Sequence, residues 1–191
     1  MAERTLNVIS ICGSLRKASF NAALARMLPS LAPPGLSITP APAWDKFPVY
    51  NADIQNSTGF PAEVIAWCDA IRAADGVVIV SPEYNWSIPG GLKNAIDWSS
   101  RLKDVPFKDK PVALQSCSGG LLGGSRMQYH LRMTLTTLDA FIFGKPEVFV
   151  NFSANKFDAK TLALTDQPTI DMVKHQLAGF EKFIRRLNGS A

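Results

Sequence analysis

Short apolar runs that alternate with stretches of helical periodicity are the feature that most restricts how this chain folds. The clearest run lies at 76–81 and contains four consecutive β-branched residues, Val77-Val78-Ile79-Val80. Such a run is typical of a strand that is buried on both faces of a parallel sheet. Four further segments have the length and composition of strands: 6–12, 36–41, 111–116 and 146–150.

Apolar residues at helical spacing occupy the segments between these runs. The predicted helices cover 21–31, 61–74, 91–102, 125–140 and a C-terminal segment with Ile170, Val173, Leu177, Phe180, Ile184 and Leu187 on one face. This alternation predicts a parallel sheet with helices on both faces in a doubly wound arrangement. Because the chain has neither a repeat nor a linker, we expect one α/β domain over residues 1–191. The segment 40–61 is expected to be a long irregular loop.

The composition is that of a globular protein. The chain has 191 residues, of which 47% are hydrophobic and 19% are charged. No apolar run approaches the roughly 20 residues that a membrane-spanning helix needs. The first residues, Met1 to Thr5, are polar and lead into a short apolar run, which is not the layout of a secretory signal. We therefore expect a cytoplasmic protein without membrane insertion.

Cysteine, histidine and charge exclude several classes of function. Cys12, Cys68 and Cys117 are widely spaced, and His130 and His175 are isolated, so neither a disulfide framework nor a metal site is expected. The formal net charge is +4, but the basic residues are dispersed rather than gathered as in nucleic-acid-binding proteins. A small anionic ligand explains this modest positive excess better than a nucleic acid.

The segment 13–21 joins the first predicted strand to the first predicted helix and reads GSLRKASFN. A helix N-terminus offers free backbone N–H groups and the positive end of the helix dipole. Ser14, Ser19 and Asn21 add short polar side chains, and Arg16 adds a guanidinium suited to phosphate oxygens. We interpret the segment as a phosphate site; the alternative is an ordinary helix cap beside an exposed arginine. Neither GxxxxGK(S/T) nor GxGxxG occurs, so a single phosphate such as that of FMN fits best.

Two further loops follow predicted strands and carry unusual residues. Segment 82–91 reads PEYNWSIPGG, which combines two prolines and two glycines with Tyr84, Asn85 and Trp86. Apolar walls with a few aimed donors suit a planar heteroaromatic ring; the alternative is a turn with core aromatics. Segment 116–124 contains four glycines, which let the backbone approach a planar ligand closely; the alternative is a flexible turn. In a parallel α/β sheet such loops meet beyond the carboxyl ends of the strands.

In this order, the strings GSLRKASFN (13–21), PEYNWSIPGGLKNAIDW (82–98) and CSGGLLGGSRMQYHLR (117–132) resemble the NADPH-dependent FMN reductase family. The resemblance is greatest with its bacterial quinone and chromate reductases. It implies a flavodoxin-like three-layer sandwich that binds FMN on a five-stranded parallel sheet in the order 2-1-3-4-5. The residues at the family's cofactor-binding positions are Ser14, Arg16, Ser19, Phe20 and Asn21 for the phosphate, Pro82, Glu83, Tyr84, Asn85 and Trp86 for the ring, and Ser116, Ser118 and Gly119 for the ring edge. Trp86 stands where a tyrosine is expected, and its larger indole is expected to narrow the space for an acceptor.

The resemblance also implies an activity. Reduced nicotinamide, NADPH or NADH, passes a hydride to FMN, and a small acceptor such as a quinone or chromate then takes the electrons in the same space. No side chain need act as nucleophile or proton donor, so no catalytic residue is predicted. The family further implies homodimers or homotetramers with Arg126, Tyr129 and Glu147 at a subunit contact; the alternative is a solvated helix face.

Three other functions compete with this interpretation. A non-enzymatic FMN electron carrier is disfavoured because flavodoxin carriers are acidic and this chain is basic. A regulatory module that binds flavin without turnover stays open. A serine hydrolase built from Ser118, Asp97 and a histidine is disfavoured because the G-x-S-x-G motif is absent.

Overall fold

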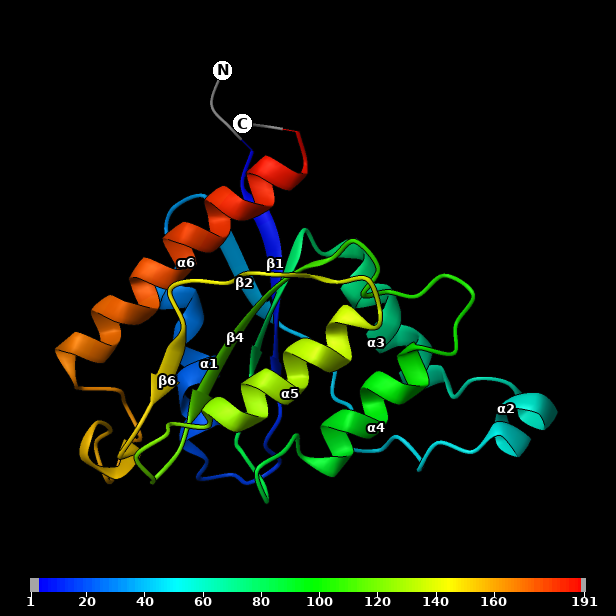
Figure 1. Cartoon of the computed structure of the whole chain (residues 1–191), viewed down its shortest axis with the longest axis horizontal. Helices are drawn as coiled ribbons and strands as arrows, with labels where there is room; N and C mark the ends of the chain where they lie inside the picture. The colour runs from blue at the N-terminus through cyan, green and yellow to red at the C-terminus, as the bar shows by residue number, and fades with distance from the viewer. Residues whose placement is uncertain (1–3, 190–191) are drawn as a thin grey trace.

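The computed structural model describes residues 4–189, and Figure 1 shows how its elements are arranged. Residues 1–3, on which part of the expected cytoplasmic location depends, lie outside the described residues. The strands are β1 (Leu6–Cys12), β2 (Leu36–Pro40), β3 (Gly76–Val80), β4 (Pro111–Cys117), β5 (Phe141–Ile142) and β6 (Val148–Val150). The helices are α1 (Phe20–Leu31), α2 (Ala52–Thr58), α3 (Ala62–Ala73), α4 (Gly90–Ser99), α5 (Ser125–Thr136), the 3-10 helix η1 (Ser153–Asn155) and α6 (Gln167–Leu187).

The strands form one parallel sheet in the order β2-β1-β3-β4-β5, with β6 also paired to β4. The register brings the ends of the central strands together, since Cys12 lies opposite Val80 and Val80 opposite Gln115. This is the flavodoxin-like order, so the predicted fold class and strand order are confirmed. The strand order reverses between β1 and β3, and in such sheets ligands bind at that point, beyond the carboxyl ends of the strands.

Helices cover both faces of the sheet (Figure 1). Apolar residues of α1 and α6 pack on one face, and those of α3, α4 and α5 pack on the other. Every residue of β3 is buried, as the apolar run at 76–81 predicted. Trp67 of α3 and Trp98 of α4 are fully buried in the second core, and burying a side chain of this size contributes on the order of 3 kcal/mol.

The predicted fifth strand at 146–150 is wrong in its extent. The structure has two short strands instead: β5 pairs with the start of β4, and β6 pairs with its end. Pro146 has no N–H to donate, so it cannot continue a hydrogen-bonded ladder through this segment. The side chain of Gln176 on α6 donates instead to the carbonyl oxygen of Pro146 (2.8 Å), which ties the interrupted edge to the body of the fold.

Two predicted helix ends and one loop also need correction. The helix predicted at 125–140 ends at Thr136, because Asp139 adopts a positive φ of 57° and the chain turns into β5; aspartate tolerates this conformation better than most residues. The helix predicted at 91–102 ends at Ser99. The segment 40–61, predicted to be irregular, contains α2, which has no buried residue and is capped by Asn51. A helix without an apolar face leaves no periodic pattern in the sequence.

The carboxyl ends of β1, β3 and β4 lie at the same edge of the sheet, the lower edge in Figure 1, away from the chain termini. The three loops that the sequence marked as unusual begin there. Within residues 4–189, no helix is both long and apolar enough to cross a membrane.

Candidate functional site

The loop after β1 passes close to the neighbouring strand before it enters α1. A Cβ atom on Gly13 would lie 2.2 Å from Ser81 Oγ, so a side chain at this position would force the two loops apart. Ser19 caps α1, and its hydroxyl accepts from the backbone N–H of Ala22 (3.4 Å). The N–H groups of Phe20 and Asn21, in the first turn of the helix, have no acceptor among the described residues. The loop therefore presents free donors at the positive end of α1.

Asn21 joins this loop to the end of β4. Its side-chain amide donates to the carbonyl oxygen of Cys117 (2.9 Å) and accepts from the Cys117 N–H (2.8 Å). The side chain is only 4% exposed, so both hydrogen bonds are shielded from water. Sequence reasoning assigned Asn21 to a phosphate; the structure shows that its amide is already engaged in holding two loops at a fixed separation.

The loop after β3 forms a tight hairpin. Tyr84 and Ser87 exchange backbone hydrogen bonds of 3.0 and 2.9 Å, and Asn85 and Trp86 between them both have positive φ angles, as in a type I′ turn. Asparagine is common in this conformation, but tryptophan is rare there. The Trp86 ring is held from outside by Arg126, whose guanidinium carbon lies 4.1 Å from the ring centroid.

Glu83 anchors the same hairpin to α5. Its carboxylate accepts from the N–H of Met127 in the first turn of α5 (3.1 Å) and lies 3.7 Å from Arg126. Gly124, which precedes the helix, has no side chain to cap it. Glu83 therefore provides the negative charge that a helix N-terminus favours, and the hairpin is fixed in place by its own acidic residue.

The glycines in the loop after β4 have two different roles. Gly119 and Gly120 have open space beside them, and a Cβ atom on either would meet no atom closer than 3.8 Å. Gly123 and Gly124 have positive φ angles, and a Cβ atom on Gly124 would lie 2.7 Å from that of Ser116. Only Gly119 and Gly120 leave space for a ligand to approach the backbone closely, as the sequence predicted for all four glycines. Gly123 and Gly124 are required by their backbone conformation and by packing.

The three loops enclose a cleft of about 250 Å³. Ten of the thirteen predicted cofactor-binding residues line it: Ser14, Arg16, Ser19, Phe20, Asn21, Pro82, Glu83, Tyr84, Ser118 and Gly119. Sequence reasoning missed Cys117, which also lines the cleft. The position of Cys117 directly after the apolar run of β4 could have indicated this.

Three predicted residues do not line the cleft. Asn85 and Trp86 lie at the tip of the hairpin, where the Trp86 side chain is 65% exposed. Ser116 is fully buried; its hydroxyl donates to the carbonyl oxygen of Gly123 (2.6 Å) and accepts from Gln128 (2.8 Å). Sequence reasoning assigned Ser116 to the ring edge, but in this structure its side chain supports the glycine-rich loop from behind.

The cleft is lined by one cationic and one anionic side chain, Arg16 and Glu83, and Glu83 already has Arg126 and the Met127 N–H as partners. The guanidinium of Arg16 is exposed and has no partner among the described residues, so it is free to bind an anion. The thiol of Cys117 faces the core, and burial raises its pKa to about 12. Burial also raises the pKa of the Cys68 thiol to about 12. Both thiols are therefore protonated near neutral pH, as is usual for buried cysteines without a reactive role.

The predicted contact residues Arg126, Tyr129 and Glu147 each have different neighbours within the chain. Arg126 contacts Glu83 and Trp86, whereas Glu147 lies 3.4 Å from Arg132. The Tyr129 side chain is exposed and lies near Phe149, with 6.4 Å between ring centroids.

Comparison with known proteins places the chain in a family. The model of the NADPH-dependent FMN reductases matches residues 6–155. A quinone reductase of Escherichia coli is 50% identical over 187 residues, which cover 98% of this chain and 99% of the relative. The NAD(P)H-dependent FMN reductase PA1204 of Pseudomonas aeruginosa is 42% identical and covers 96% of this chain and 98% of its own.

Solved structures agree with this assignment. The NAD(P)H:acceptor oxidoreductase FerB of Paracoccus denitrificans superimposes with a TM-score of 0.85 at 31% identity, over 95% of this chain and 98% of its own. The protein therefore belongs to the NADPH-dependent FMN reductase family, and the predicted resemblance is confirmed.

Proposed function

We propose that this chain is an FMN-dependent NAD(P)H oxidoreductase that reduces quinones at the cleft between the loops after β1, β3 and β4. The observation that carries the proposal is the grouping, in one cleft, of ten residues predicted separately from three loops. Family membership and the names of full-length relatives support the reaction type. The described residues contain no cluster of three or more potential metal ligands, and the proposal includes no metal.

The residues at the N-terminus of α1 fit a phosphate. Two backbone N–H groups, those of Phe20 and Asn21, lack acceptors there, and the hydroxyls of Ser14 and Ser19 lie in the same wall of the cleft. Arg16 adds a positive charge without a partner of its own. Charge-assisted hydrogen bonds contribute about 1.5–3 kcal/mol each, so we expect these groups to hold the FMN phosphate more strongly than the helix dipole does.

The remaining walls fit a flat ring. Pro82 and Tyr84 offer apolar surface on one side, and Gly119 leaves open space on the other. When bound, FMN would supply the redox chemistry, because no residue in the cleft can take up a hydride. The contribution of the protein is to orient the ring through a hairpin fixed by Glu83 and to keep the loops apart through Asn21.

The finer features of the prediction belong to the same proposal. We place one domain over residues 1–191 in the cytoplasm, where the free thiols Cys12, Cys68 and Cys117 would stay reduced. We include anionic acceptors such as chromate beside quinones, and a chromate ion would be favoured by positive charge near the cleft. A homodimer or homotetramer would cover the exposed apolar side chains of Tyr129 and Met133, one turn apart on α5.

Rapid mixing with NADPH tests the proposed reaction. We expect NADPH to bleach the flavin absorbance at about 450 nm, and we expect excess quinone to restore it over many turnovers. An electron carrier would hardly bleach with NADPH, and a regulatory module would bleach without turnover on any quinone. Either result would contradict the proposal that this chain is an enzyme.

Replacing Trp86 tests whether this residue influences the choice of acceptor. We expect Trp86→Ala to change the ratio of kcat/KM for a naphthoquinone to that for a benzoquinone by about fivefold. The affinity for FMN should change much less, because the indole is exposed and does not line the cleft. Trp86→Tyr is the matched control and should give an intermediate ratio. An equal loss of kcat/KM with both quinones would argue against a role of Trp86 in acceptor choice.

A further inference from the structure

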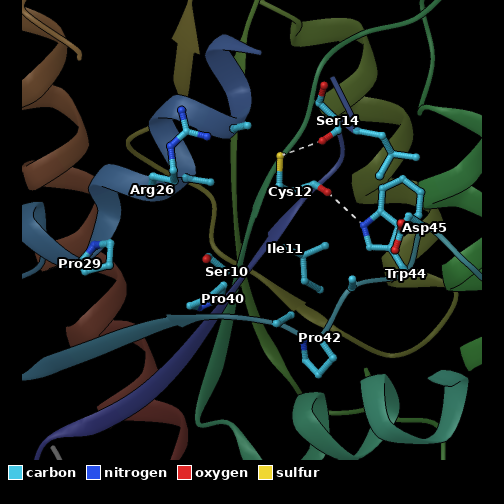
Figure 2. A pocket seen from close by; sticks show the side chains of 15 residues that line it. Ser10, Ile11, Cys12, Ser14, Arg26, Pro29, Pro40, Pro42, Trp44 and Asp45 are labelled. Atoms are coloured by element: carbon cyan, nitrogen blue, oxygen red, sulfur yellow. Dashed lines mark hydrogen bonds between the residues drawn. The ribbon is translucent and has the colours of Figure 1, made fainter. Parts of the chain in front are cut away.

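A second cavity lies behind the loop 13–19, between α1, the end of β1 and the segment 40–45 at the end of β2. We call it the α1–β2 cavity; Figure 2 shows it from close by. Its volume is about 540 Å³, larger than the cleft and within the range of small-molecule sites. Ser14 lies in the wall of both spaces, so the loop 13–19 separates the cavity from the cleft.

The walls of the α1–β2 cavity are mainly apolar. Ala25 and Pro29 contribute from α1, and Ile11 contributes from β1. Trp44 closes the cavity from the side of the 40–45 segment, and its indole N–H donates to the carbonyl oxygen of Cys12 (3.0 Å). This hydrogen bond fixes the aromatic wall, so the cavity has a built shape rather than the loose outline of a surface loop.

Charge at the cavity is confined to its two ends. Arg26 lies on α1 at one end, and Asp45 lies beyond Trp44 at the other (Figure 2). The guanidinium of Arg26 has no hydrogen-bond or ion-pair partner among residues 4–189. The thiol of Cys12 faces the space between them, and its Sγ lies 3.5 Å from the carbonyl oxygen of Ser14. Burial raises the pKa of this thiol, so it adds no negative charge near neutral pH.

From this arrangement we infer that the α1–β2 cavity binds a small aromatic monoanion, with its rings against Trp44 and its carboxylate or sulfonate at Arg26. The unpaired guanidinium attracts the anionic end, and Asp45 repels it from the opposite end, which fixes the orientation. The site is separate from the proposed FMN cleft and does not depend on FMN being bound there.

Calorimetric titration with 2-naphthoate tests this site in the full-length chain, both as purified and saturated with FMN. We expect one molecule to bind per chain with a Kd on the order of 100 μM, which is typical for a ligand of this size, and we expect FMN not to displace it. Ala43→Phe should weaken binding more than tenfold, because Ala43 is an exposed residue of the cavity wall and a phenyl ring there would fill part of the space.

Charge variants test the orientation of the ligand. Arg26→Gln should weaken 2-naphthoate binding about fivefold, because Arg26 is exposed and an exposed ion pair contributes at most about 1 kcal/mol, and it should leave binding of the neutral 2-naphthol unchanged. Asp45→Asn should not weaken 2-naphthoate. Arg186→Gln, which removes an exposed guanidinium at the other end of the fold, is the matched control and should have no effect.

Several results would overturn the inference. Absence of binding, or competition between 2-naphthoate and FMN one for one, would show that the cavity is not a separate site. Equal losses of 2-naphthoate affinity in Arg26→Gln and Arg186→Gln would contradict the proposed ion pair at Arg26. A changed sedimentation coefficient for Ala43→Phe, without ligand binding by the parent chain, would show that a second copy of the chain covers the cavity instead.

Discussion

Arg16→Ala is expected to weaken FMN binding about 10- to 100-fold, the loss that one charge-assisted hydrogen bond to a phosphate implies. Arg16 lines the cleft, is exposed, and has no partner that would compete for its guanidinium within residues 4–189. For the same reason its removal breaks no contact within the fold, so the melting temperature of the flavin-free chain should stay the same. Fluorescence titration of FMN into flavin-free protein measures the affinity directly.

Lys17→Ala provides the control for this experiment. Lys17 is the next residue along the chain and is also exposed, but it does not line the cleft. Its removal lowers the local positive charge without removing a phosphate ligand, and we expect at most about a threefold loss, as for exposed charges in general. Equal effects of the two variants would reduce the role of Arg16 to general electrostatics, and an unchanged FMN affinity in Arg16→Ala would refute the phosphate assignment.

Asn21→Ala is expected to lower the free energy of unfolding of the flavin-free chain by about 2–4 kcal/mol. The substitution leaves the N–H and C=O groups of Cys117 buried without their present partners, and each such group costs on the order of 1–3 kcal/mol. FMN binding should weaken as well, because the loops after β1 and β4 are no longer tied together. Urea unfolding monitored by tryptophan fluorescence measures the change.

Asn51→Ala is the matched substitution for comparison. Asn51 caps α2 through the N–H of Asp53 (2.8 Å) on the surface, where water replaces the lost acceptor. We expect a loss of at most about 1 kcal/mol, the usual cost of an exposed N-cap, with no effect on FMN. If both asparagine variants lose the same stability, the proposed tie between the two loops has no special importance.

The sequence was sufficient for the layers because they depend on patterns that burial imposes, whereas the strand order was predicted from the resemblance to the family. A strand such as β3, covered on both faces, has to be apolar throughout, and right-handed crossovers then leave few arrangements. The division of the last strand into β5 and β6 could not be predicted from a pattern, since each piece is too short to show one. The exposed helix α2 was missed for the opposite reason: no face of it is buried.

For the candidate site, the sequence indicated which loops matter but not what each side chain does. Ser14, Arg16 and Tyr84 line one cleft because the carboxyl ends of parallel strands meet at one edge. The burial of Ser116 depends on Gln128, twelve residues further along on another element, and no local signal records that contact. The assignment of these residues to FMN stays a prediction, whereas the family of the chain is established.

The most direct test of the central claim compares FMN with riboflavin, which has the same ring but no phosphate. If the N-terminus of α1 holds the phosphate, flavin-free protein should bind FMN at least about 100-fold more tightly than riboflavin, since two or more charge-assisted contacts are lost. Equal affinity for the two flavins would show that the phosphate is not held there and would contradict the account.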